Sequence, residues 1–216
     1  MINIKKNYTI SIKLLIFLIL LIGCSSKEKD SATVVLNDIQ IYKTGLSSLE
    51  NENYKKAIIE FDNLSLNHPF SSLAKKSDIM TAYSLYQNNE IKKSINKLRI
   101  FIEMNPNDEF SDYAHYLLAM CYYIQVSNQG RDPSLSIKAL NSFMLIITKY
   151  PNSKYAKDSK LKIQYIKNSL ANNELDIGKF YLKKNAPART IKRFQSILQN
   201  YQNTSSIPET LYRLTE

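Results

Sequence analysis

One spaced pattern recurs four times along this chain and constrains its fold more than any other feature. Each copy has a small residue, a large apolar residue four positions later, an apolar residue three further on, and usually a proline after five more. Spacings of three and four place side chains on one face of an α-helix, and a proline ends the helix. We therefore expect an all-α fold, with no strand. The copies are Ala57-Phe61-Leu64-Pro69, Ser94-Leu98-Phe101-Pro106, Ala139-Phe143-Ile146-Pro151 and Thr190-Phe194-Ile197-Gln202.

A second small residue precedes each copy. Gly45, Ala82 and Gly178 stand twelve residues before the small residue of their copies, and Ala119 stands twenty before Ala139. Two small residues in register let the backbones of two helices approach closely, which resembles the tetratricopeptide repeat. The resemblance implies a right-handed solenoid of about four helix pairs plus a terminal helical stub at 209–215. We expect these residues to be buried: Ala57, Phe61, Leu64, Leu98, Phe101, Ala119, Ala139, Phe143, Ile146, Phe194 and Ile197.

Two departures from the regular spacing indicate local additions. Eight extra residues in the third copy fall around 127–133, where glycine and proline indicate a loop. No proline or glycine interrupts residues 153–177, so a helix over 154–184, about 46 Å long at 1.5 Å per residue, should precede the fourth copy.

The N-terminus reads as an export signal. Three lysines precede the apolar run 14–22, which is too short to span a bilayer as a helix. Leu21-Ile22-Gly23-Cys24 resembles the lipobox of bacterial lipoproteins, which implies removal of residues 1–23 and a covalent lipid on Cys24. The alternative is an ordinary signal peptide that ends near a cysteine. Ser25 favours the outer membrane, and the polar residues 24–37 are expected to form a flexible tether.

Composition argues against catalysis and against nucleic-acid binding. Without the leader, 26 basic residues stand against 19 acidic ones, but the lysines are scattered and export separates the chain from the genome. His68 and His115 are the only histidines, and neither has a partner at metal-ligand spacing. Cys121 lies in an apolar run and is expected to be a buried free thiol. We therefore predict no enzyme activity, no catalytic residues, no metal and no cofactor apart from the lipid.

Several short segments together resemble the BamD (ComL/YfiO) family of outer-membrane lipoproteins, over the lipobox and about residues 38–216. The resemblance implies a lipid-anchored scaffold at the periplasmic face of the outer membrane. Its partners would be BamA, other lipoproteins of the β-barrel assembly (BAM) machinery and nascent outer-membrane proteins. The chain lacks the glycine and proline that usually follow the first segment in the family. The segments are His68-Pro69-Phe70-Ser71, Ala82-Tyr83, Phe101–Pro106, Asp112-Tyr113, Tyr116-Leu117, Arg131-Asp132-Pro133 and Lys149–Tyr155.

The resemblance also divides the repeats, with the half 38–126 receiving clients and the half 127–216 docking a partner. Counting along the first helix of each repeat gives a groove face rich in tyrosine, a residue that combines a broad apolar ring with a hydroxyl. Core packing of the same rings is an equally weighted alternative. The groove candidates are Tyr42, Leu46, Tyr83, Tyr86, Tyr113, Tyr116, Met120 and Tyr123.

The partner-docking candidates are Arg131, Asp132, Arg189 and Arg193. The first two lie in the loop that breaks the repeat spacing, at the end through which the resembled family docks its barrel subunit, and the other two are arginines one turn apart, which can pair bidentately with carboxylates. For each arginine taken singly, a solvated surface charge is the alternative. Two other functions remain open for such a repeat lipoprotein. One is a pilotin for secretin subunits, which should lack the 131–133 loop and the long helix. The other is a regulatory lipoprotein of a cell-wall enzyme.

Overall fold

The computed structural model describes the backbone of residues 29–126 and 133–215, and side chains from residue 37 onward within these ranges. The predicted signal peptide, Cys24, Arg131 and Asp132 lie outside the described residues. Every regular element in the described ranges is an α-helix, so the all-α prediction is confirmed. The helices are α2 (Lys29–Glu50), α3 (Tyr54–Asn67), α4 (Ala74–Gln87), α5 (Ile91–Met104), α6 (Ser111–Val126), α7 (Ser134–Lys149), α8 (Ala156–Lys183), α9 (Pro187–Asn200) and α10 (Ile207–Arg213).

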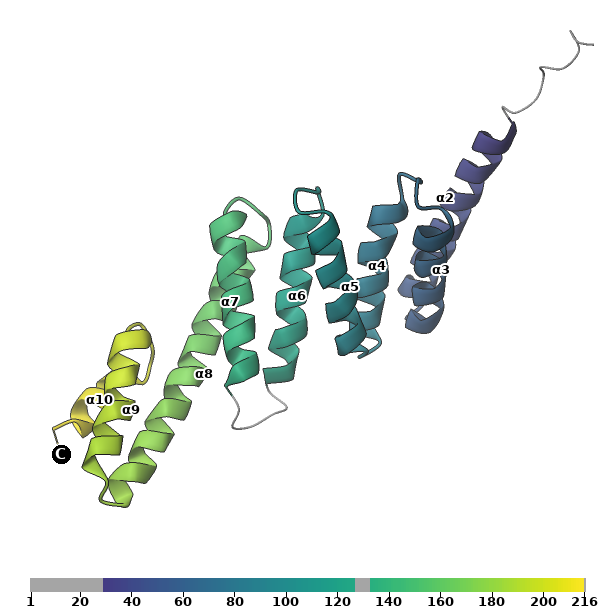
Figure 1. Cartoon of the computed structure of the whole chain (residues 1–216). Coiled ribbons are helices and arrows are strands. Elements are labelled where there is room, and N and C mark those ends of the chain that lie inside the picture. The colour runs from purple at the N-terminus through teal and green to yellow at the C-terminus, as the bar shows by residue number, and fades with distance from the viewer. Residues whose placement is uncertain (1–28, 127–132, 216) are drawn as a thin grey trace, which may run out of the picture. The chain divides into compact units, whose positions relative to one another are not determined.

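The chain divides into two compact units, residues 1–40 and 41–216, and the second unit holds all four repeats. Within it, each helix from α3 to α10 packs against the next one in sequence, as in a tetratricopeptide-like solenoid (Figure 1). All eleven residues predicted to be buried are at most 3% exposed, so the predicted register of the repeat is confirmed.

Glycine allows a close approach within two of the helix pairs. A Cβ atom on Gly45 would lie 2.6 Å from Cε1 of Phe61, and one on Gly178 would lie 2.3 Å from Cε1 of Phe194. Neither distance is compatible with van der Waals contact, so each phenylalanine ring fills space that only a glycine leaves open. In the second repeat the buried Ala82 and the smaller Leu98 occupy the equivalent positions.

The turns inside three helix pairs share one geometry. Glu52, Asn89 and Asn185, which are equivalent in the repeat, all have a positive φ between 52° and 60°. In each turn the next residue donates its N–H back to a carbonyl of the preceding helix, as Asn53 does to Ser48 at 2.8 Å. This is the Schellman arrangement that ends many helices. Asparagine tolerates the left-handed conformation well, whereas Glu52 adopts it at a cost.

The long helix predicted over 154–184 is present as α8, whose 28 residues extend about 42 Å. Its first half packs Ile163 and Ile166 into the cluster that contains Phe143 of α7. Its second half packs Ala171 and Leu175 against Phe194 of α9. Helix α8 therefore acts as the first helix of a repeat twice in succession, without a break.

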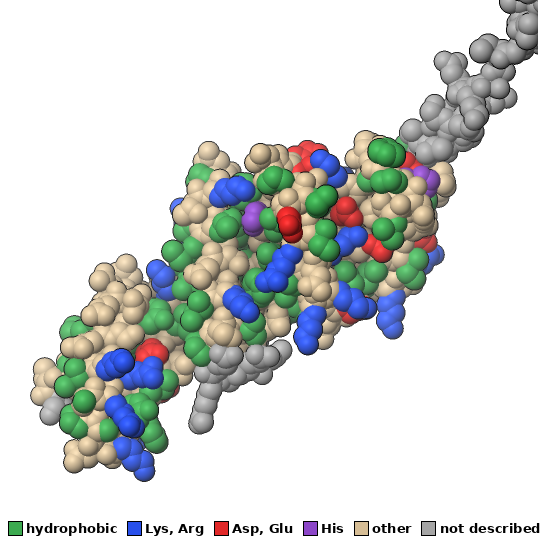
Figure 2. Space-filling model, viewed as in Figure 1, with side chains coloured by type: hydrophobic (Ala, Val, Ile, Leu, Met, Phe, Trp, Pro, Cys, Tyr) green, Lys and Arg blue, Asp and Glu red, His purple; other side chains and the backbone are tan. Residues whose placement is uncertain are grey.

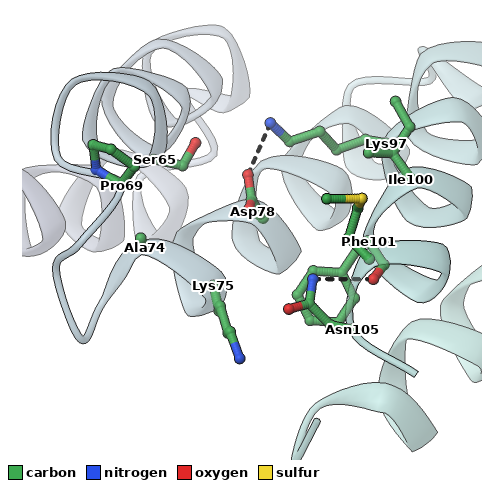
Figure 3. Close-up of a pocket in the computed structure, with 10 residues that line it drawn as sticks. Ser65, Pro69, Ala74, Lys75, Asp78, Lys97, Ile100, Phe101 and Asn105 are labelled. Carbon is green, nitrogen blue, oxygen red and sulfur yellow. Dashed lines mark hydrogen bonds and ion pairs between the residues drawn. The ribbon is translucent and has the colours of Figure 1, made fainter. Parts of the chain in front are cut away.

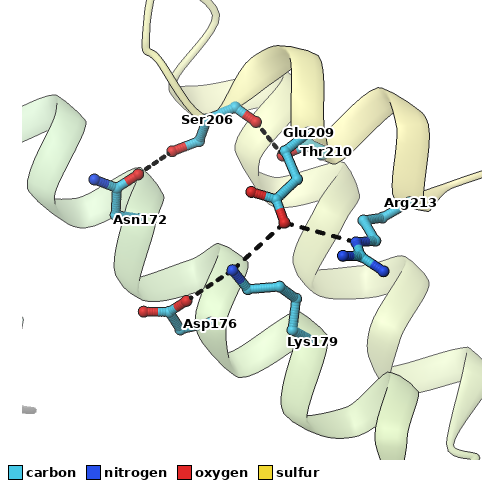
Figure 4. A network of polar contacts seen from close by, with 7 residues as sticks. All are labelled: Asn172, Asp176, Lys179, Ser206, Glu209, Thr210 and Arg213. Carbon is cyan, nitrogen blue, oxygen red and sulfur yellow. Dashed lines mark hydrogen bonds and ion pairs between the residues drawn. The ribbon is translucent and has the colours of Figure 1, made fainter.

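Helix α10 is the terminal stub that the sequence predicts, and polar contacts join it to α8 (Figure 4). Lys179 lies 3.2 Å from Asp176 on its own helix and 3.5 Å from Glu209 of α10. The Ser206 hydroxyl donates to Asn172 at 2.5 Å, and the Thr210 hydroxyl donates to the Ser206 carbonyl at 2.7 Å. These contacts fix the stub on the side of α8 that faces away from α7.

We expected residues 24–37 to form a flexible tether. The structure instead has helix α2 beginning at Lys29, within that range. No glycine or proline interrupts residues 29–44, so the helix continues without a break into the first repeat. None of the helices in the described ranges is long and apolar enough to cross a bilayer.

The close approach at Gly178 makes a testable prediction. Gly178→Ala should destabilise the fold by about 1–3 kcal/mol, because the buried Phe194 ring has to move. Phe194→Leu in the same chain should recover part of that loss, since it recreates the pair found at Ala82 and Leu98. Urea unfolding of the two single variants and the double variant measures the coupling. Additive losses would contradict this account.

Candidate functional site

Seven tyrosines of α4, α6, α8 and the N-cap position of α8 form an aromatic surface, here called the tyrosine face. Its centre is the Tyr155 ring, which stacks on Tyr116 (centroids 4.6 Å apart, planes at 18°) and on Tyr113 (5.3 Å, 30°). Helices α4 and α6 contact each other directly, and the Tyr155 ring just before α8 reaches two rings of α6, so rings distant in sequence meet there. The tyrosine face comprises Tyr83, Tyr86, Tyr113, Tyr116, Tyr123, Tyr155 and Tyr165.

Two hydroxyl groups of this face, those of Tyr113 and Tyr116, are held protonated. Burial raises the pKa of Tyr116, and so does the hydrogen bond of 2.7 Å that its hydroxyl donates to Asp158. Burial also raises the pKa of Tyr113, with a further contribution from nearby tyrosines. These two hydroxyls are therefore neutral donors and acceptors, a chemistry that suits stacking and hydrogen bonding.

A basic and an acidic group lie within the face on α8. Lys162 contacts Asp158 at 3.1 Å and also lies 5.4 Å from the centroid of the Tyr123 ring. Tyr123 in turn meets Tyr165 edge to face, with centroids 6.0 Å apart. The ion pair is satisfied internally, which leaves the ring surfaces as the principal contact area.

A cleft of about 540 Å³ opens at one end of the face, where α4, α6 and α8 begin. Tyr113, Tyr155 and Ile79 provide its apolar wall. Lys76 and Lys154 stand beside Glu109 and Asp112 at its margin, so the cleft carries both signs of charge. Its volume lies within the range of ligand-binding clefts.

The predicted groove residues separate into two groups. Tyr42 is 8% exposed and packs on Phe61 with ring centroids 5.5 Å apart, which supports the alternative of core packing there. Leu46 and Met120 are half-buried and pack against core clusters. The other five predicted residues, Tyr83, Tyr86, Tyr113, Tyr116 and Tyr123, are brought together in the tyrosine face.

Three residues were not among the groove residues predicted from the sequence: Tyr155 at the N-cap of α8, and Leu161 and Tyr165 on α8. Tyr155 lies at the centre of the stack, and Tyr165 and Leu161 are 62% and 65% exposed. Counting forward from the proline that ends each second helix would have found two of them. Leu161 and Tyr165 stand ten and fourteen residues after Pro151, as Tyr116 and Met120 do after Pro106.

The predicted docking arginines have different environments. Arg193 donates to both carboxylate oxygens of Glu174 at 3.0 Å and so joins α9 to α8. Arg189 is exposed and lies 5.5 Å from the Tyr181 ring centroid. Arg131 and Asp132 lie outside the described residues.

Basic side chains gather where α8 turns into α9 (Figure 2). Six lysines and arginines and no acid occur between residues 177 and 194. We call this segment the basic turn. The exposed ring of Phe180 and the half-buried ring of Tyr181 belong to it.

The described part of the chain shows no cluster of three or more histidine, cysteine or acidic side chains placed to hold a metal. Cys121 is buried, and burial raises its thiol pKa to about 11. The thiol is therefore protonated near neutral pH, which disfavours a nucleophilic role.

Comparison with known proteins gives consistent results. A family described as YfiO, outer membrane lipoprotein, matches residues 36–216. The outer membrane protein assembly factor BamD of Rickettsia prowazekii is 39% identical over 94% of this chain and 80% of its own length. The proteins of the same name from Caulobacter vibrioides and Neisseria meningitidis serogroup A are 34% and 28% identical, over 90% and 80% of this chain and 64% and 68% of their own lengths. These matches show that the chain belongs to the YfiO family of outer membrane lipoproteins.

Proposed function

We propose that this protein is a lipid-anchored, non-enzymatic scaffold of the β-barrel assembly machinery at the periplasmic face of the outer membrane. It binds BamA and nascent outer-membrane proteins. The observation that carries the proposal is the 39% identity to a BamD protein over 94% of the chain, which includes the whole tyrosine face. Membership of the YfiO family favours this function over a secretin pilotin or a regulator of a cell-wall enzyme. Co-purification from a detergent extract tests the proposal. Recovery of BamA would support it, recovery of a secretin would indicate a pilotin, and recovery of a cell-wall enzyme would indicate a regulator of that enzyme.

The client binds the tyrosine face in this proposal. An extended peptide segment with aromatic side chains can stack on exposed rings such as Tyr165, and it can place one side chain in the cleft beside Tyr113 and Tyr155. Tyrosine loses little conformational entropy on binding because it has few rotatable bonds. The face therefore suits many related clients.

The partner BamA binds the opposite end of the repeats, at the basic turn. Arg189 is available there, whereas Arg193 is already paired with Glu174. An acidic patch on the partner would complement this segment, and arginine would contribute paired hydrogen bonds to a carboxylate. The contribution of Arg193 is to hold α9 in place.

The lipid anchor is tested at Cys24. Cys24→Ser removes the thiol that accepts the lipid, so the variant should leave the outer-membrane fraction, either as soluble protein or as an uncleaved precursor. Cell fractionation with immunoblotting measures the distribution, and Cys121→Ser serves as the control that keeps Cys24. A Cys24→Ser protein that still fractionates with the outer membrane would show that another feature anchors the chain.

The client site is tested at Tyr165, which is exposed, and at Tyr83, which is half-buried at the margin of a core cluster. Tyr83→Ala combined with Tyr165→Ala should weaken binding of a C-terminal peptide from an outer-membrane protein by about ten-fold or more, as two stacking contacts are lost. Fluorescence anisotropy of the labelled peptide measures the change. Tyr212→Ala is the matched control, because Tyr212 on α10 has the same 62% exposure as Tyr165. Equal affinities for all variants would place the client site elsewhere.

The docking site is tested by charge reversal. Arg189→Glu should weaken BamA binding by about ten-fold while the melting temperature stays unchanged, since the side chain is exposed. Lys160→Glu, an exposed lysine of α8 outside the basic turn, is the control. Arg193→Glu should lower the melting temperature instead, because it places two carboxylates together. Wild-type BamA binding by the Arg189 variant would contradict the proposed interface.

A further inference from the structure

Large apolar side chains are exposed where α3 ends, at the turn into α4, and where α5 ends. Phe70 is fully exposed, and Met104, Leu66 and Ile100 are 74%, 69% and 60% exposed. A cavity of about 400 Å³ lies beside them, lined in part by Pro69, Ile100 and Met104 (Figure 3). Scattered apolar residues are ordinary on a surface, but here Pro69, Ile100 and Met104 share one cavity, and Phe70 directly follows Pro69 in the chain. Such a grouping indicates a binding surface. We call Leu66, Pro69, Phe70, Ile100 and Met104 the Phe70 edge.

The charged groups around this cavity are satisfied within the chain. Lys97 contacts Asp62 at 2.8 Å and Asp78 at 2.9 Å. Lys75 contacts Asp108 at 2.8 Å. A ligand recognised by charge would have to compete with these ion pairs. An apolar ligand would instead be stabilised by burying apolar area, with no ion pair to break. The Phe70 edge therefore favours a hydrocarbon occupant.

The path of the chain indicates which hydrocarbon is near. Ile41 and Tyr42, where the second compact unit begins, pack in one cluster with Leu73 and Ala74, which follow Phe70 closely. Lys76 on the first turn of α4 also lies 5.2 Å from the Tyr42 ring centroid. The chain that leads from Cys24 thus enters the second unit in its first repeat, beside the start of α4, which closely follows Phe70.

The length of the chain between Cys24 and Ile41 limits how far the first repeat can lie from the anchor. Residues 29–40 are helical and rise about 18 Å in total. Residues 24–28 add at most about 18 Å when fully extended. A lipid on Cys24 therefore keeps Ile41 within about 36 Å of the acylated residue, and the Phe70 edge begins in that first repeat.

We propose that the Phe70 edge is a second membrane contact, which inserts Phe70, Leu66 and Met104 into the interface of the phospholipid bilayer that holds the anchor. This inference rests on the proposed lipidation of Cys24. Burial of these side chains adds to the apolar area that the acyl chains already bury. Two points of attachment also fix the orientation of the repeats relative to the membrane, which a single point of attachment does not.

The sequence contains no tryptophan, so Phe70→Trp creates a single fluorescent reporter on this edge. The full-length lipidated variant is reconstituted on phosphatidylcholine vesicles with or without bromine on the upper acyl chain. We expect a blue-shifted emission and a loss of intensity of about two-fold on the brominated vesicles. Tyr165→Trp, a reporter with 62% exposure on the tyrosine face, is the matched control and should be unaffected.

Flotation of the same vesicles separates the possible failures. Protein that floats while the Phe70 reporter keeps its emission in water overturns the membrane contact and leaves the lipid anchor intact. Protein that does not float overturns both the anchor and this inference. A blue shift that grows with protein concentration in the absence of lipid would show that a second copy of the chain covers the edge, which also overturns the proposal.

Discussion

The rest of the structure depends on one contact, in which a large side chain of one helix packs on a glycine or alanine of its paired helix. Phe61 and Phe194 occupy space above Gly45 and Gly178 that any side chain would fill. Because the ring determines how closely the two helices approach, it also determines the position of the next pair. A regular stack results, and the first helices of neighbouring repeats present their side chains to one common surface.

The tyrosine face follows from that stacking. Tyr113 and Tyr116 of α6 meet Tyr155 because α6 and the start of α8 are neighbours in the stack, although about forty residues separate them in sequence. Burial raises the pKa of Tyr113 and Tyr116, so these two hydroxyls do not ionise near neutral pH. The same rings both stabilise the repeat and offer exposed surface, which is why packing and binding were hard to separate from the sequence.

Features with a short period were predictable from the sequence, and features that depend on helix rotation were not. The spacing of Ala57, Phe61 and Leu64 gave the buried register correctly because burial on one helical face repeats every three to four residues. Leu161 and Tyr165 were missed because the fourth repeat was counted from Gly178, and α8 contains two successive first helices. The pairing of Arg193 with Glu174 depends on how α9 is rotated against α8, which no local pattern encodes.

The continuity of α8 means that the repeats of this protein are not interchangeable modules. Ile163 and Ile166 complete the packing of the pair before it, whereas Leu175 and Gly178 complete the packing of the pair after it. A fragment that ended after α7 would leave the α7 cluster uncovered, and one that began within α8 would carry an uncovered apolar stripe. Insertion, deletion or exchange of a single repeat at this point would break two cores at once, although the sequence pattern alone suggests separable units.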